Sequence, residues 1–140
     1  MKVKKEIEQL SEQGKVWELR EMFGNGYNEE IKKIARIYLN LAGAIYVFNM
    51  GIKAIGKGKE ENGNVNTCYL RTLQSIAKDG LLLGDYASKI AELVLQRISK
   101  KNLRGNLRKE IEEMEKKWKT VIKKELENKI NNNNQIIVKR

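Results

Sequence analysis

The feature that most constrains this fold is an uncharged run at residues 37–52, IYLNLAGAIYVFNMGI, in a chain that is otherwise densely charged. The 140 residues include 28 lysines and arginines and 18 aspartates and glutamates, but no proline and no histidine. Because proline is the strongest helix breaker, its absence beside abundant Lys, Glu, Leu and Ile predicts an all-α chain. The run is shorter than the roughly 20 apolar residues that a spanning helix needs. We therefore expect it to form a buried core helix.

Helical spacing of apolar residues, broken by glycine-rich and asparagine-rich stretches, predicts how the chain is divided. Asn28 is a good N-cap for the central helix, and the polar segment 56–66 ends it. We expect a helical bundle of about four core helices with an extended C-terminal amphipathic helix. The expected parts are an N-terminal helical arm at 1–26, a helical-bundle core at 27–105, the amphipathic helix at 106–130 and a flexible tail at 131–140.

The chain lacks the residue types on which most catalytic and metal sites depend. Without histidine, the usual general base and the commonest metal ligand are missing. The single cysteine, Cys68, has no partner for an intrachain disulfide, and we expect it to be a small buried apolar side chain. The glycines at 56, 58 and 63 follow no strand and precede no Gly-Lys-Ser/Thr, which argues against a phosphate loop. We expect no catalytic residue, no metal and no cofactor.

The formal net charge of +10 favours a polyanionic partner, because cations that neutralise phosphates release condensed counterions. The first thirty residues do not contribute, since they hold 5 basic and 7 acidic side chains. For any single lysine, an ordinary solvated charge is the competing interpretation. The candidate nucleic-acid-binding residues are the cations at the two ends of the central helix, namely Lys32, Lys33, Arg36, Lys53, Lys57 and Lys59.

The C-terminal helix carries a narrow apolar stripe, and almost everything between the members of the stripe is charged. Such a helix is either docked along that one stripe or is an arm that meets another subunit or a membrane surface. We assign the stripe as facing a partner or an envelope. Its members are Leu107, Ile111, Met114, Trp118, Ile122 and Leu126.

Two stretches resemble the major coat proteins of filamentous viruses of hyperthermophilic archaea, the lipothrixvirus and rudivirus lineage. They are GAIYVFNMGIKAI at 43–55 and YLRTLQSIAKDGLLLGDYASKIAELVLQRI at 69–98. The resemblance implies a helical-bundle coat protein that packs around double-stranded DNA in A form, often as a pair of homologous subunits. In enveloped members a C-terminal part faces lipid. On this reading Lys32, Lys33, Arg36 and Lys53 would contact DNA.

The function that we expect is therefore a structural nucleoprotein: a coat protein, located in a filamentous virion, that packages double-stranded DNA through non-sequence-specific backbone contacts. Its partners would be the DNA, a homologous coat subunit and, in an enveloped particle, lipid. One alternative is a small helical subunit of a CRISPR effector complex, which would be cytoplasmic and bind a guide–target duplex. Another is a protein-interaction module such as a viral inhibitor.

Overall fold

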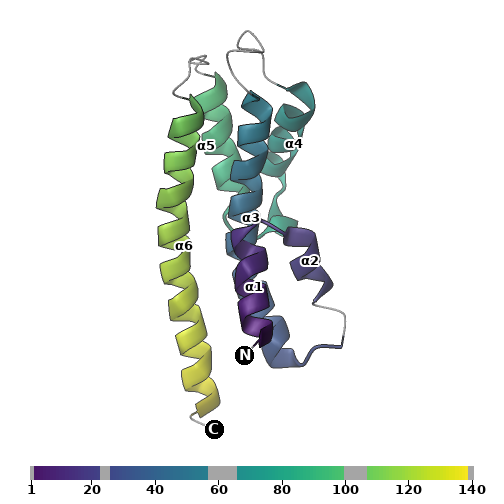
Figure 1. Ribbon diagram of the computed structural model, residues 1–140, viewed down its shortest axis with the longest axis vertical. Helices are drawn as coiled ribbons and strands as arrows, with labels where there is room; N and C mark the ends of the chain where they lie inside the picture. The colour runs from purple at the N-terminus through teal and green to yellow at the C-terminus, as the bar shows by residue number, and fades with distance from the viewer. Residues whose placement is uncertain (1, 23–25, 57–65, 100–106, 139–140) are drawn as a thin grey trace.

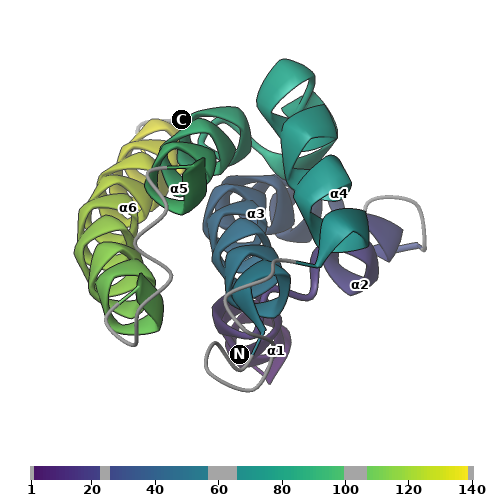
Figure 2. The ribbon, with the colours of Figure 1, turned by 90° about the horizontal axis from the view of Figure 1, so that it is seen from above.

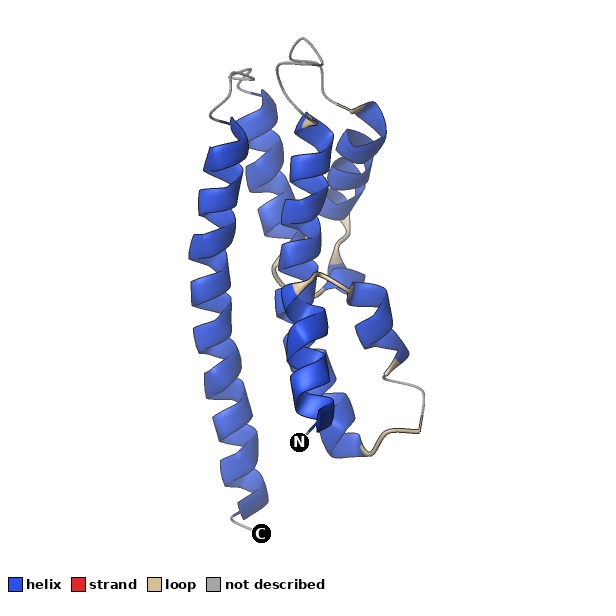
Figure 3. Ribbon diagram, viewed as in Figure 1, coloured by secondary structure: helices blue, strands red, loops and turns tan. Residues whose placement is uncertain are grey.

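The computed structural model describes residues 2–22, 26–56, 66–99 and 107–138, and side chains only within residues 3–132. Over these residues the regular elements are helices and no strand is present, so the expected all-α class is confirmed (Figure 3). Six α-helices and one short 3-10 helix follow one another along this part of the chain. They are α1 (Lys2–Glu12), α2 (Val16–Glu21), α3 (Glu29–Ile55), α4 (Thr67–Lys78), η2 (Leu81–Leu83), α5 (Ala87–Ser99) and α6 (Leu107–Val138).

Helix α3 is the axis of the molecule, and the other helices pack around it (Figures 1 and 2). It begins after Asn28, whose side-chain oxygen accepts a hydrogen bond from the backbone N–H of Ile31 at 2.9 Å. It ends before Gly56, whose φ of 60° favours glycine. The uncharged middle of α3 is buried without a break from Leu39 to Ile45. The prediction of a buried core helix is confirmed, and none of the described helices is long and apolar enough to cross a bilayer.

Helices α1 and α2 pack against α3 and do not form an arm separate from the bundle. Ile7, Val16 and Leu19 are at most 1% exposed and belong to the same core as the central helix. The reason is that helices of 11 and 6 residues are too short to be stable without tertiary contacts, so their apolar faces must be covered. The boundary that we expected at residue 26 therefore does not separate two packing units.

Helix α6 lies along α3 and α5 (Figure 1). Its apolar stripe is buried in the core of its own chain. This corrects the assignment of the stripe to a partner or an envelope: the docked-helix alternative is the one observed. An apolar stripe of this width can be buried equally well within its own subunit or against another subunit. The sequence alone therefore did not distinguish between these two arrangements. Leu107, Ile111, Ile122 and Leu126 are at most 3% exposed, and Met114 and Trp118 are partly buried against them.

The Trp118 ring illustrates how α6 contacts the start of α5 and the residue just before it. It meets the Tyr86 ring edge-on, with centroids 5.9 Å apart and planes at 63°, and Lys89 Nζ lies 6.0 Å from the Trp118 centroid. Helix α6 also continues to Val138, beyond the end that we expected at residue 130. The predicted tail at 131–140 is therefore helical as far as Val138, since asparagine is a weak helix former but, unlike proline, keeps its backbone N–H and does not block the helix.

Cys68 is exposed, which corrects the prediction that it is buried. It lies in the first turn of α4, where its backbone N–H donates to the Asn66 side chain at 3.0 Å. The buried face of α4 is formed instead by Leu73 and Ile76. Cys68 therefore lies outside the buried face of α4.

Candidate nucleic-acid interface

The cations that we predicted to form one band lie at opposite ends of α3. Lys32, Lys33 and Arg36 are in its first turns, whereas Lys53 is in its last, about 30 Å away at 1.5 Å per residue. Lys32 is also partly covered and pairs with Glu29 at 3.5 Å. These residues cannot act as one compact patch within a subunit. Lys57 and Lys59 lie outside the described residues.

A groove between α3 and α6 surrounds Lys53 with other cations. It has a volume of about 540 Å³ and follows the side of α6 that flanks the buried stripe. The two helices run side by side (Figure 1), so side chains far apart in sequence line the same groove. We call it the α3–α6 groove. Its described lining consists of Asn49, Ile52, Lys53, Arg108, Glu112, Glu115, Lys116 and Lys119.

The charge in the α3–α6 groove is predominantly positive, with four cations against two carboxylates. One carboxylate, Glu112, accepts a hydrogen bond from Arg108 Nε at 3.0 Å. The other, Glu115, is partly buried, and this burial raises the pKa of its carboxyl above the usual range. Lys119 opposes that rise in pKa and Glu112 adds to it. The Glu115 carboxyl therefore takes up a proton at a higher pH than an ordinary glutamate, and the groove then carries one negative charge fewer.

A second hollow of about 260 Å³ continues this surface towards the turn between α1 and α2. It shares Asn49 and Lys53 with the α3–α6 groove and adds Lys15 and Trp17, whose side chain is 53% exposed. Gly14 allows the turn to approach α3: its φ is +73°, and a Cβ there would lie 3.0 Å from the Tyr46 backbone nitrogen. The turn thus brings an exposed aromatic ring to the edge of the groove, together with one further cation, Lys15, and one further carboxylate, Glu18.

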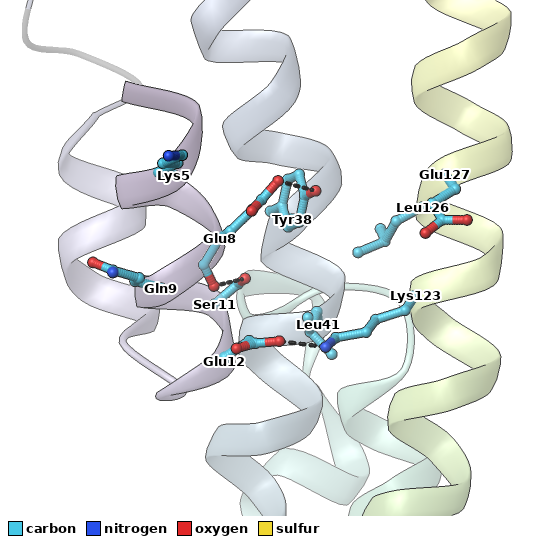
Figure 4. A pocket seen from close by; sticks show the side chains of 10 residues that line it. All are labelled: Lys5, Glu8, Gln9, Ser11, Glu12, Tyr38, Leu41, Lys123, Leu126 and Glu127. Carbon is cyan, nitrogen blue, oxygen red and sulfur yellow. Dashed lines mark hydrogen bonds and ion pairs between the residues drawn. The ribbon is translucent and has the colours of Figure 1, made fainter. Parts of the chain in front are cut away.

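Another large cavity in the described part of the chain has a different set of charged side chains (Figure 4). It lies between α1, α3 and α6, with a volume of about 450 Å³, and its titratable lining includes three carboxylates and two lysines. Glu12 is paired with Lys123, and the Tyr38 hydroxyl donates to Glu8 at 3.3 Å. The lining residues are Lys5, Glu8, Gln9, Ser11, Glu12, Tyr38, Leu41, Lys123, Leu126 and Glu127.

Burial and the neighbouring Glu8 carboxylate raise the pKa of Tyr38 to about 12, so its hydroxyl stays neutral and continues to donate. Since the lysines of this cavity are outnumbered by carboxylates, it is a poor site for a polyanion. Of these two hollows, the α3–α6 groove is the better site for a polyanion. Among the described residues no three His, Cys, Asp or Glu side chains are grouped so that they could hold a metal ion.

Arg108, Lys116 and Lys119 were missed at the sequence level because the cations of α6 alternate with glutamates, which suggested weak net attraction for phosphate. The signal that could have found them is their spacing. Steps of eight and three residues place all three near one face of a helix, next to the apolar stripe. That face becomes a binding surface only when α6 is docked on α3.

Comparisons with protein-family models, with curated proteins and with solved structures each gave no match. The resemblance to filamentous-virus coat proteins therefore stays a prediction.

Proposed function

We propose that this protein is a structural nucleic-acid-binding protein that holds the backbone of duplex DNA in the α3–α6 groove, without sequence preference. The observation that carries the proposal is the convergence of Lys53 from α3 with Arg108, Lys116 and Lys119 from α6 on one groove. Cations on rigid helices at several-ångström spacing match the demands of a phosphate backbone, which carries no sequence information itself.

In this proposal each subunit makes a few phosphate contacts, and the affinity of the assembly comes from many subunits on one polymer. That is the arrangement expected of a DNA-coating virion protein, the role that the sequence resemblance implies. The bundle of four core helices with an extended C-terminal helix is the architecture that the proposal assumes. The helices around α3 form the body of the subunit, and α6 forms one wall of the binding groove.

The test compares two charge-reversal variants that change the net charge equally. Lys53→Glu with Lys116→Glu alters the α3–α6 groove, whereas Lys33→Glu with Arg36→Glu alters exposed cations at the other end of α3. Binding to two labelled duplexes of unrelated sequence is followed by fluorescence anisotropy between 50 and 200 mM salt, roughly the range over which counterion release is large.

For the unmodified protein, four phosphate contacts predict a slope of log K against log salt of about −3 to −4, equal for the two sequences. The groove variant should bind more weakly and show a slope closer to zero by about 2. The control variant should keep the slope of the unmodified protein. An equal loss in both variants would show that only the net charge matters, and a binding constant independent of salt would refute backbone recognition altogether.

A further inference from the structure

An exposed tryptophan lies beside the proposed binding groove. Trp17 is 53% exposed, and it lines the hollow of about 260 Å³ that adjoins the α3–α6 groove, together with Tyr46 and Asn49 of α3. We call this the Trp17 hollow. Because drug-sized ligands occupy pockets of roughly 300–1,000 Å³, a hollow of this volume suits a single small group of atoms.

The exposed position of Trp17 is fixed by the packing of its neighbours. Val16 and Leu19, which belong to the same helix α2, are at most 1% exposed and are part of the core. The preceding turn touches α3 closely, since a Cβ on Gly14 would lie 3.0 Å from the backbone nitrogen of Tyr46. The tryptophan is therefore held out from the surface on a closely packed turn and helix.

The Trp17 hollow is continuous with the α3–α6 groove, because Asn49 and Lys53 line both. These two residues are about one turn apart on α3, roughly 6 Å, a distance that a nucleic-acid strand covers in about two nucleotides. The hollow adds one cation, Lys15, and one carboxylate, Glu18, so the charge that it adds is zero. A strand that leaves the groove can therefore reach the hollow, where no further attraction for phosphate is gained.

What the Trp17 hollow adds to the groove is aromatic and amide side chains. Trp17 and Tyr46 have flat π surfaces, on which every nucleobase can stack. Gln13 and Asn49 carry amides that both donate and accept hydrogen bonds, as the edges of nucleobases do. A base inside a duplex has both of its faces covered by the neighbouring base pairs, so the base that stacks on Trp17 must be unpaired.

We infer that the Trp17 hollow binds an unpaired base at the point where a duplex held in the α3–α6 groove opens into a single strand. The inference rests on the proposed function, and it narrows the substrate to DNA in which a duplex adjoins a single-stranded segment. One stacked base strengthens binding by roughly 5- to 150-fold. Because every base has a π face, this preference is for an unpaired base and not for a sequence.

The first experiment compares the affinities of three labelled DNA probes by fluorescence anisotropy at one salt concentration. All contain the same duplex, which is blunt-ended, or has a short overhang of adenine nucleotides, or has an overhang of abasic nucleotides. The abasic overhang keeps the phosphates and removes the bases, so it is the matched control for charge. Both overhangs are made on either strand, so that both strand directions are tested. The adenine overhang should bind roughly 5- to 150-fold more tightly than the abasic overhang.

Protein variants then locate the base. Trp17→Leu removes the π face and keeps an apolar side chain, so it should bind the adenine and abasic overhangs equally. Trp17→Tyr restores an aromatic ring and should recover most of the preference. Val121→Ala is the control, because Val121 is 52% exposed on α6 and lines neither the groove nor the hollow, and it should keep the full preference. A preference that survives in Trp17→Leu overturns the inference.

The second experiment detects the stacked base directly. The chain has two tryptophans, so in a Trp118→Phe background the emission comes from Trp17. A base stacked on the indole quenches this emission, so the adenine overhang should quench it and the abasic overhang should not. Equal affinity for both overhangs with unchanged emission overturns the inference, leaves the proposed function standing and favours a protein surface as the partner of Trp17. Failure of every probe to bind refutes the proposed function and this inference with it.

Discussion

Replacing Gly43 by alanine tests how the turn between α4 and α5, which contains η2, is positioned. A Cβ at Gly43 would lie 1.5 Å from the Leu83 carbonyl oxygen and 2.6 Å from its carbon. Real Cβ atoms keep at least 3.0 Å, so η2 must retreat from α3 by about 1.5 Å. The obstacle is backbone and cannot rotate away. Overpacking of this kind costs about 1–3 kcal/mol, and the hydrogen bond from Asp85 to Asn40 adds about 1 kcal/mol when it is lost.

Helix propensity alone would favour alanine at this position by about 1 kcal/mol, so the net loss in the free energy of unfolding is about 2 kcal/mol. For a chain of this size that lowers the Tm by about 5–10 °C. The control is Gly51→Ala in the same helix, where the nearest atoms to the Cβ belong to the Val94 side chain, the closest being a methyl at 2.8 Å. Val94 is buried and β-branched, so some strain is expected there too, but the obstacle is a side chain and not backbone, and the loss should be smaller than that of Gly43→Ala. Thermal and urea unfolding, followed by circular dichroism, measure the stability of both variants. A Gly43→Ala protein as stable as the Gly51→Ala protein would refute the close-approach argument.

Three further predictions concern the titratable groups and the core. Because the pKa of Tyr38 is raised from 10.0 to about 12, the folded state holds its proton longer than the unfolded state. Stability should therefore fall as pH rises from about 10 to 12, and the loss should be smaller in Tyr38→Phe, as urea unfolding at each pH will show. The raised pKa of Glu115 means that the groove loses a negative charge as pH falls through that pKa, so DNA binding should strengthen there. Glu115→Gln should bind more tightly at neutral pH and lose most of this pH dependence in anisotropy titrations. Ile111 is fully buried, so Ile111→Ala should lower the free energy of unfolding by about 2–5 kcal/mol in urea titrations, against about 1 kcal/mol for Ile111→Val.

The elements of the fold were largely predictable because they are fixed by local chemistry. The uncharged run at 37–52 admits only a buried helix, and Asn28 caps α3 at the position expected from its side chain. Asn66 caps α4 in the same way, by accepting from the backbone of Cys68. Periodicity and capping act within a few residues along the chain, so one sequence is enough to find them.

The candidate site was not predictable in the same way, because it is formed by residues that are distant in sequence. The prediction included Lys53 but grouped it with Lys32 and Lys33, which lie on the same helix about 30 Å away. The residues that do lie near Lys53 come from α6, more than fifty positions further along the chain. Periodicity shows that a face of α6 is buried, but not which surface covers it.

The corrected role of the α6 stripe explains why the groove exists. Ile111 and Ile122 are fully buried, and this fixes the rotation of α6 about its own axis. With the rotation fixed, the flanking face that carries Lys116 and Lys119 must lie beside α3, at the level of Lys53. The stripe that we assigned to an external partner therefore contributes to the proposed DNA contact from within, by orienting cations that it does not itself contain. A helix that met its partner along the stripe would have turned those cations to a different surface, and the α3–α6 groove would not form.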